Sequence, residues 1–245
     1  MMGAFDRARY GPPLAVPREG LLAQAAREVG AMVHLLPFRG VTTVFWPPLW
    51  GRLPVVGQLT ALLRDARIDA VISDYHALPF AGAAARKVGV PVLWMLHGWW
   101  FPVYPWQRGF FRRDVARVFA VSRAVRDGWL RRARLFAPDE IPVLRPGVDP
   151  DHFPPGVDPA SIRDQLNIGT DAPLVALLAR FQRVKGHDTF QDMARLVLDA
   201  LPAARFVVAG GNVFDVRRDD AYKRRIRERW QGDPALRTAI TYLGH

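Results

Sequence analysis

The chain has 245 residues, of which half are apolar and 23% are charged, and this composition is typical of a globular protein rather than a disordered one. It contains no cysteine, which excludes disulfides, cysteine-ligated metal centres and thiol nucleophiles. The 34 basic and 23 acidic residues leave a net charge of +11, which favours nucleic acid, acidic membrane or phosphorylated ligands but does not choose among them.

The first half of the chain alternates amphipathic segments with short apolar runs. This pattern predicts helices over residues 18–30, 55–66 and 77–88, and strands over residues 31–36, 68–73, 90–96, 115–121 and 141–144. Ser122 directly follows one of these strands and is expected to cap the next helix. Nothing in the first 20 residues has the apolar run of a signal peptide. The uncharged stretch 90–107 contains three prolines, so we interpret it as a strand and a tryptophan-rich loop rather than a membrane span.

A turn-rich stretch, residues 146–159, divides the chain. It holds five prolines and two glycines and is expected to be a linker. Beyond it the pattern predicts strands over residues 174–179, 205–209 and 239–243, and helices over residues 188–201 and 222–230. Strands that alternate with helices are typical of parallel sheets covered on both faces. The sequence therefore predicts an α/β protein with two parallel-sheet domains, residues 1–157 and 158–245.

The short motifs of several enzyme classes are absent from the sequence. It has no phosphate loop, no dinucleotide fingerprint, no HExxH and no GxSxG, which argues against P-loop ATPases, zincins and serine hydrolases. Asp149 and Asp151 could together hold a metal ion, but short aspartate pairs are common in turns, and we expect no metal.

The most informative charges follow the first strand of the second domain. Arg180 ends this strand, and Lys185 and Gly186 precede a helix for which Asp188 is a candidate cap. Ligands of open α/β sheets bind at the carboxyl ends of the strands, and a helix N-terminus favours an anion through its N–H groups and dipole. The spacing therefore predicts a diphosphate site, with an ordinary basic loop as an equal alternative.

Five phrases of the sequence, in the same order along the chain, resemble retaining glycosyltransferase family 4. They are Asp74 and His76 with residues 89–98, VFAVS at 118–122, PGVD at 146–149 with Phe153, ARFQRVKGHD at 179–188 followed by FVVAGG at 206–211, and LGH at 243–245. The resemblance covers nearly the whole chain, and five ordered phrases are far more specific than any one of them.

The resemblance implies the GT-B architecture, in which two Rossmann-like domains face each other across a cleft. The C-terminal domain would hold a nucleotide diphosphate-sugar and the N-terminal domain the acceptor. The sugar would be transferred with retention of configuration, without a metal or other cofactor. Arg180 and Lys185 would neutralise the departing diphosphate, which is electrostatic catalysis. His97 would lie near the transferred sugar, with a histidine satisfied beside neighbouring tryptophans as the alternative.

The resemblance also assigns residues to the two sides of the reaction. Gly186, Gly210 and Gly211 would bring the backbone close to the donor, with plain tight turns as the alternative. The acceptor or sugar side would hold Asp74, His76, Gly98 and Trp99. The motif between the domains corresponds to Gly147, Val148 and Asp149.

The sequence departs from the family pattern at both ends. It begins with residues that resemble the region after the family's first strand and glycine-rich turn, and Pro146 stands where the family has asparagine. It has only four glutamates, and no two of them have the seven-residue separation of the family's donor-binding pair. We therefore expect a truncated chain with an incomplete second domain. A folded remnant that transfers no sugar is the main alternative to an active enzyme.

A strongly basic segment follows a group of aromatic residues. Nine arginines and two aspartates lie between Arg108 and Arg134. The aromatic residues before or beside them are Trp99, Trp100, Phe101, Tyr104 and Trp106. This combination suits an acidic membrane surface or a phosphorylated lipid acceptor, and less well single-stranded nucleic acid, but it also fits an ordinary solvated helix face.

Together these observations predict a glycosyltransferase. It would take a sugar from a nucleotide diphosphate-sugar donor and give it to a glycan or lipid-linked acceptor during assembly of a cell-surface polysaccharide or glycolipid. We expect it in the cytoplasm, at the inner face of the membrane. A basic nucleic-acid-binding protein is the second alternative.

Overall fold

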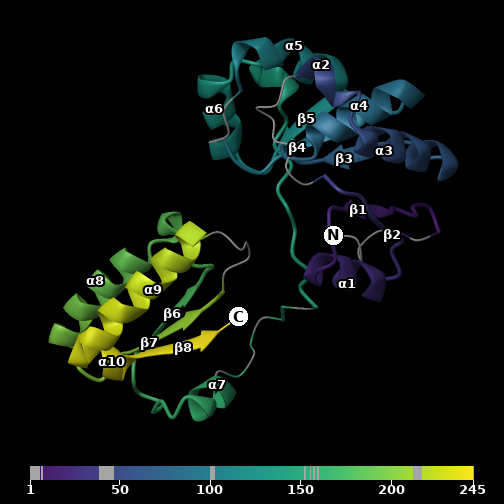
Figure 1. Cartoon of the computed structure of the whole chain (residues 1–245). Helices are drawn as coiled ribbons and strands as arrows, with labels where there is room; N and C mark the ends of the chain where they lie inside the picture. Colours follow the sequence, from purple (N-terminus) through teal and green to yellow (C-terminus); the bar gives the residue numbers. More distant parts are fainter. Residues whose placement is uncertain are drawn as a thin grey trace. The chain divides into compact units, whose positions relative to one another are not determined.

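A computed structural model of the chain describes residues 6, 8–38, 47–99, 103–151, 153, 154, 156, 158, 160–211 and 217–244 (Figure 1). The chain divides into two compact units, residues 1–149 and 150–245. The division falls within the proline-rich stretch 146–159. Each unit combines a three-stranded parallel sheet with helices, so the α/β class that the alternating pattern predicted is confirmed.

The main sheet of the first unit consists of β3 (Val71–Ser73), β4 (Val92–Leu96) and β5 (Arg117–Ala120), all parallel and in the order β3-β4-β5. A separate parallel pair is formed by β1 (Leu14–Val16) and β2 (Val33–Leu35). The hydrophobic pattern predicted β2 to β5. It did not predict β1.

Helices connect these strands and pack beside them (Figure 1). They are α1 (Leu21–Glu28), α2 (Pro47–Trp50), α3 (Pro54–Asp65), α4 (Leu78–Val88), α5 (Pro105–Asp114) and α6 (Arg123–Arg132), with a 3₁₀ turn, η2, over Pro138–Glu140. The Ser122 hydroxyl accepts a hydrogen bond from the Val125 N–H at 3.2 Å, which confirms the predicted cap of α6.

Two sequence predictions for the first unit are wrong. Residues 141–144 do not form a strand, because only Val143 pairs, through a single parallel bridge to the end of β5. The tryptophan-rich loop is shorter than expected, because α5 begins at Pro105. The first turn of a helix tolerates proline. The Gln107 side chain also stabilises this helix start, because its carbonyl oxygen accepts a hydrogen bond from the N–H of Tyr104, the residue before the helix, at 3.1 Å.

Aromatic rings fill the core of the first unit beneath β4. Trp94 stacks on Phe111 with ring centroids 5.3 Å apart and meets Trp129 edge to face at 5.1 Å. All three side chains are at most 2% exposed. α4 is buried over residues 78–85 and packs against α3 and α5. The loops that follow β3 and β4 are therefore held on a rigid support.

The sheet of the second unit consists of β6 (Leu174–Leu178), β7 (Arg205–Ala209) and β8 (Ile240–Gly244), all parallel and in that order. Its three strands were predicted to within one residue. The apolar runs were recognisable because strands of a parallel sheet are apolar along their whole length.

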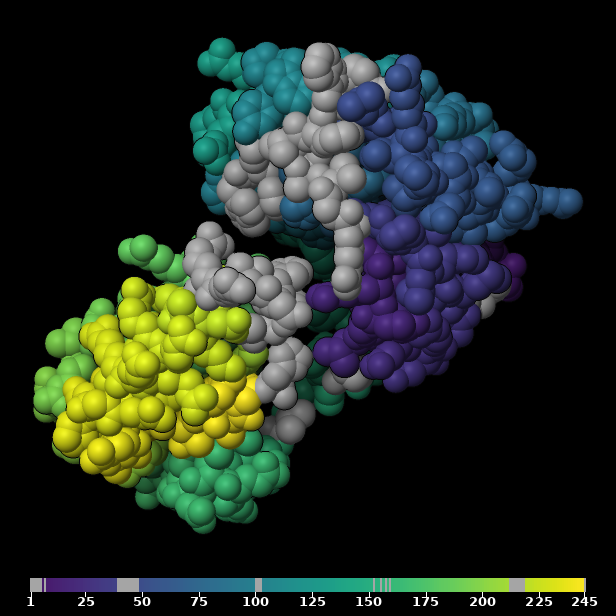
Figure 2. Space-filling model, in the orientation of Figure 1, coloured from purple at the N-terminus to yellow at the C-terminus, as the bar shows by residue number. Residues whose placement is uncertain are grey.

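The helices of the second unit are α7 (Ala160–Gln165), α8 (His187–Ala200), α9 (Arg217–Gly232) and α10 (Pro234–Ala239), with a 3₁₀ turn, η3, over Arg183–Lys185. Figure 1 shows α8 and α9 side by side on one side of the sheet. The buried Gln191 amide donates to the Ile226 carbonyl at 2.7 Å and ties the two helices together. The yellow C-terminal residues, α9 and α10 among them, form much of this unit's visible surface in Figure 2.

None of the helices in the described part of the chain combines the length and the apolar run that crossing a membrane requires.

Candidate functional site

The predicted donor-side residues meet at the carboxyl end of β6. The strand ends at Leu178, Arg180 follows two residues later, and Lys185 closes the 3₁₀ turn that leads into α8. Arg180 is half-buried, whereas Lys185 is exposed. Two cations thus stand at a strand end beside a helix N-terminus, as the spacing predicted.

Gly186 makes the turn between η3 and α8. Its φ of 71° lies in the left-handed region, which glycine adopts without strain. Its carbonyl accepts the Phe190 N–H at 2.8 Å and so begins α8, without any hydrogen bond from a capping side chain. The glycine lets the chain turn sharply from Lys185 into the helix.

Asp188 does not cap α8, so that prediction is wrong. It lies inside the first helical turn, and its carboxylate accepts hydrogen bonds from the Tyr222 hydroxyl at 2.5 Å and from Arg225 at 3.2 Å, both on α9. The Tyr222 hydrogen bond lowers the pKa of Asp188. Because Asp188 already places a negative charge at this helix end, an anion here would rely on Arg180 and Lys185 more than on the helix dipole.

His187 is buried beneath the same turn. Its ring stacks on Phe181 with centroids 4.3 Å apart and meets Tyr222 edge to face at 6.0 Å. Burial lowers the pKa of His187, so the imidazole stays neutral at physiological pH and adds no charge to the site. The histidine of this motif therefore has a packing role.

Titration of Tyr222 is expected near pH 12. Burial, together with the hydrogen bond to Asp188, raises the pKa of Tyr222 from 10.0 to about 12. The folded chain then holds this proton more tightly than the unfolded chain, so the stabilisation is complete below about pH 10 and is lost as the pH rises through about 12. The tyrosinate absorbance that Tyr222→Phe removes should appear near pH 12; its appearance near pH 10 would contradict the burial.

Gly210 and Gly211 join the ends of the three strands. Gly210 has φ +143°, and a Cβ there would lie 2.1 Å from the Ala179 carbonyl oxygen, so only glycine fits. The Tyr242 hydroxyl donates to the Gly210 carbonyl at 2.9 Å, and the Phe181 N–H donates to the Gly211 carbonyl at 3.2 Å. The two glycines thus fix the strand edge from which Arg180 projects.

The predicted acceptor-side residues gather around a small cavity in the first unit. Its volume is about 60 Å³, and its walls are Asp74, Tyr75, His76, Met95, Leu96, His97, Gly98 and Trp129. The first three follow β3, and the next four lie at the end of β4. The parallel pairing of these strands therefore brings four of the predicted residues together, namely Asp74, His76, His97 and Gly98.

Polar groups form the rim of this cavity, and aromatic rings form its floor. Asp74, His76 and His97 are exposed, whereas Tyr75 and Trp129 are buried. The Asp74 carboxylate accepts the Ala77 N–H at 2.8 Å, which shapes the turn into α4. Tyr75 and Trp129 belong to no motif, and the sequence pattern did not single them out.

Several other predicted residues are not among the described residues that line this cavity. Trp99 is not part of the cavity wall and is 37% exposed. Gly147, Val148 and Asp149 are exposed and end the first unit. Trp100, Phe101 and His245 fall outside the described residues.

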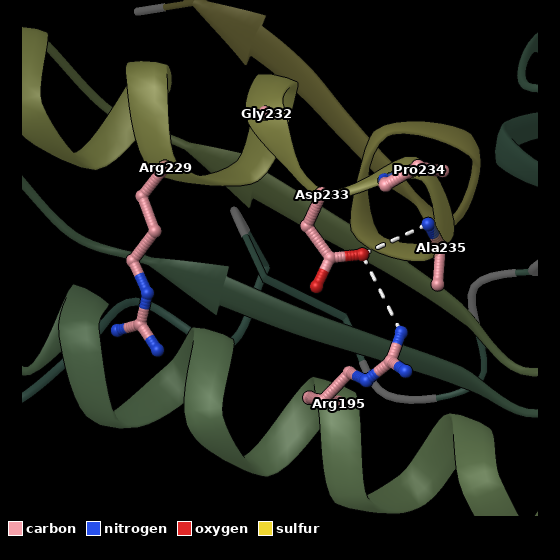
Figure 3. Close-up of a pocket in the computed structure, with 6 residues that line it drawn as sticks. All are labelled: Arg195, Arg229, Gly232, Asp233, Pro234 and Ala235. Carbon is pink, nitrogen blue, oxygen red and sulfur yellow. Dashed lines mark hydrogen bonds and ion pairs between the residues drawn. The ribbon is translucent and has the colours of Figure 1, made fainter.

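A wider, open depression of about 660 Å³ lies on the helices of the second unit (Figure 3). Its walls are Arg195, Arg229, Gly232, Asp233, Pro234 and Ala235. Asp233 accepts a hydrogen bond from Arg195 at 3.4 Å, and Arg229 pairs with Asp192. Because both arginines already face carboxylates, this depression is an ion-paired junction of α8, α9 and α10 and holds none of the predicted site residues.

Asp233→Ala is expected to lower the free energy of unfolding by about 1 kcal/mol. The Asp233 carboxylate caps α10 by accepting the N–H groups of Ala235 at 2.9 Å and Leu236 at 3.2 Å. Its exposed contact with Arg195 adds little. Thermal melts of Asp233→Ala and Asp233→Asn provide the test, since asparagine keeps a cap acceptor and should keep most of the stability. Equal melting temperatures for Asp233→Ala and the parent would contradict the cap.

The fold of the chain is similar to that of several solved structures. A glycosyltransferase from Rickettsia africae ESF-5 has a TM-score of 0.70 at 16% identity, over 93% of this chain and 58% of its own. HepE of Anabaena, in complex with UDP and glucose, has a TM-score of 0.74 at 16% identity, over 94% and 60%. A trehalose-6-phosphate structure from E. coli, bound with UDP-2-fluoro glucose, has a TM-score of 0.58 at 18% identity, over 78% and 52%.

The structural likeness confirms the predicted GT-B-like α/β fold of Rossmann-like units. At these identities it establishes the fold alone, and the chain spans about three-fifths of the length of the first two structures. No curated protein sequence matches the chain. Residues 8–152, which are more than half of the chain and include the cavity beside His97, match the family model described as Glycosyltransferase Family 4. The chain therefore belongs to Glycosyltransferase Family 4.

Proposed function

We propose that this protein transfers a sugar, with retention of configuration, from a nucleotide diphosphate-sugar to a glycan or lipid-linked acceptor. Membership of the family supports transfer, and the Anabaena neighbour in complex with UDP and glucose supports a nucleotide-sugar donor. The observation that carries the proposal is the position of Arg180 and Lys185 at the end of β6, beside the turn into α8. Cations in that place suit a diphosphate.

In the proposed reaction the bond between the anomeric carbon and the diphosphate oxygen breaks, and its electron pair stays on the phosphate. Arg180 and Lys185 stabilise this developing charge. The oxygen of an acceptor hydroxyl forms the new bond to the anomeric carbon on the face from which the diphosphate departs, and its proton passes to the departing phosphate oxygen. His97, on the rim of the first unit's cavity, stands on the side of the transferred sugar. Two fixed cations can do the electrostatic work of a metal, so we propose that transfer needs none.

Calorimetry with UDP, GDP and ADP tests the donor site. Saturable binding of one nucleotide, weakened by Arg180→Ala and unchanged by EDTA, would support the proposal. Because the chain spans only part of its neighbours, the same titration also tests the alternative of a folded protein without transfer activity. No binding of any nucleotide, in a chain that melts cooperatively, would favour that alternative.

We also propose that α5 contacts an acidic membrane from the cytoplasmic side, during synthesis of a cell-surface polysaccharide or glycolipid. Tyr104 and Trp106 stack at its start with centroids 5.8 Å apart and are 40% and 48% exposed. Exposed aromatic rings beside arginines suit the lipid interface. Glu140 and Asp114 pair with Arg112 and Arg113 and reduce the positive charge further along the helix.

Sedimentation with vesicles tests this membrane contact. Vesicles that contain phosphatidylglycerol should retain the protein more than vesicles of phosphatidylcholine alone, and serine at positions 104 and 106 should weaken retention. The nucleic-acid alternative would be favoured if a single-stranded oligonucleotide abolished vesicle binding and the serine variant bound vesicles as well as the parent protein.

A further inference from the structure

The turn that carries His97 is held from below by a residue of α6. The Trp129 indole N–H donates a hydrogen bond to the Gly98 carbonyl at 2.5 Å, across 31 residues of sequence. Trp129 is 2% exposed and also forms part of the cavity wall. The residue after His97 is therefore anchored to the helix through its backbone.

The neighbouring residue of α6 holds the same turn from its other end. A Cβ at Gly128 would lie 2.3 Å from Cγ and 2.7 Å from Cβ of Trp99, so the Trp99 side chain rests directly on the bare Cα of Gly128. Gly128 has no positive φ that would demand glycine for the backbone itself. Glycine is required at this point because of Trp99.

The anchor itself is rigid. Trp129 meets Trp94 edge to face at 5.1 Å and lies 6.4 Å from the Tyr75 ring, inside the aromatic core. Fixed rotamers in a packed core limit the movement of whatever they hold. Two consecutive residues of one helix thus hold this turn: Trp129 holds the Gly98 carbonyl, and Gly128 supports the Trp99 side chain. The adjacent His97 is exposed and lines the cavity.

We propose that Trp129, together with Gly128, is a positioning pair that sets the place of His97 for sugar transfer. The proposal rests on the function proposed above, in which His97 stands beside the transferred sugar. Small displacements of a reacting group can cost up to about a hundredfold in rate. A loosened His97 turn should therefore slow transfer without weakening nucleotide binding, since the residues proposed to bind the diphosphate belong to the other unit.

Trp129→Phe removes the N–H donor and keeps an aromatic ring, whereas Gly128→Ala displaces Trp99. Trp50→Phe is a matched control, because Trp50 is equally buried in the same core and its ring packs against Phe110 and Phe111 rather than against Trp129. Transfer kinetics, nucleotide calorimetry, melting temperature and amide hydrogen exchange at residues 97–99 should be measured for all three variants.

The expected result is a fall of about tenfold or more in kcat for Trp129→Phe and Gly128→Ala, with nucleotide affinity unchanged and exchange at residues 97–99 faster. Trp50→Phe should keep kcat even if it melts earlier. Normal kcat and normal exchange in Trp129→Phe would overturn the proposal, as would an equal loss of kcat in Trp50→Phe. If the parent protein transfers no sugar, the proposed function fails and kcat cannot be compared between the variants. Hydrogen exchange at residues 97–99 then still tests the anchor, because an unchanged exchange rate in Trp129→Phe would overturn the positioning role.

Discussion

Replacing Arg180 or Lys185 with alanine is expected to reduce sugar transfer by about ten- to a hundredfold. A charge-assisted contact to phosphate contributes about 1.5–3 kcal/mol, and about 1.4 kcal/mol corresponds to a factor of ten in rate. Both side chains lie at a strand end outside the apolar core, so the melting temperature should change little. Initial rates of transfer and calorimetric nucleotide affinity measure the effect.

The control for these variants is Arg195→Ala on α8. Arg195 pairs with Asp233 and Asp199 in the open depression and lies apart from the predicted donor residues. The Arg195→Ala variant should transfer sugar at the normal rate. Arg180→Lys should restore only part of the activity, since an ammonium group cannot reproduce a two-pronged contact. Near-normal rates in both the Arg180 and the Lys185 alanine variants would refute the donor-site assignment.

Replacing Gly210 with alanine is expected to destabilise the second unit by at least about 2 kcal/mol. The new Cβ would lie 2.1 Å from the Ala179 carbonyl oxygen, and φ is +143°, so the chain would suffer both a clash with backbone and strain. In a domain of this size a loss of 2 kcal/mol lowers the melting temperature by about 10 °C. Thermal unfolding followed by circular dichroism measures the change.

Gly232→Ala provides the matched control. Gly232 lies at the end of α9, has no positive φ, and a Cβ there meets no atom within 4 Å. Its melting temperature should stay the same or rise slightly, because alanine favours the helix. A Gly210→Ala chain as stable as Gly232→Ala would show that the strand ends do not pack as described.

Local patterns were enough to predict much of the fold. β4, β6 and β7 were recognisable from their apolar runs, and α3 and α8 from their one-sided periodicity. Each of these signals lies within a few residues of the feature that it predicts. The same is true of Ser122, whose hydroxyl reaches an N–H only three residues away.

Local patterns misled where a short signal had competing meanings. Pro105 suggested a loop but begins α5, since a proline in the first helical turn costs no hydrogen bond. Asp188 was predicted to cap α8, but its carboxylate instead accepts a hydrogen bond from the Tyr222 hydroxyl, 34 residues away in the sequence. The sequence alone cannot show which partner a polar side chain will find.

The sequence by itself determined which residues could carry the chemistry. The parallel strand pairing explains why the residues chosen in each unit lie close together. Arg180 and Lys185 follow one strand, and His76 and His97 follow two strands that pair in parallel, so their ends share one edge. Only the tertiary structure revealed Trp129 beneath Gly98 and Gly128 beneath Trp99. Those contacts join segments about 30 residues apart in the sequence. They depend on how α6 packs into the aromatic core, and a local hydrophobic pattern cannot predict that packing.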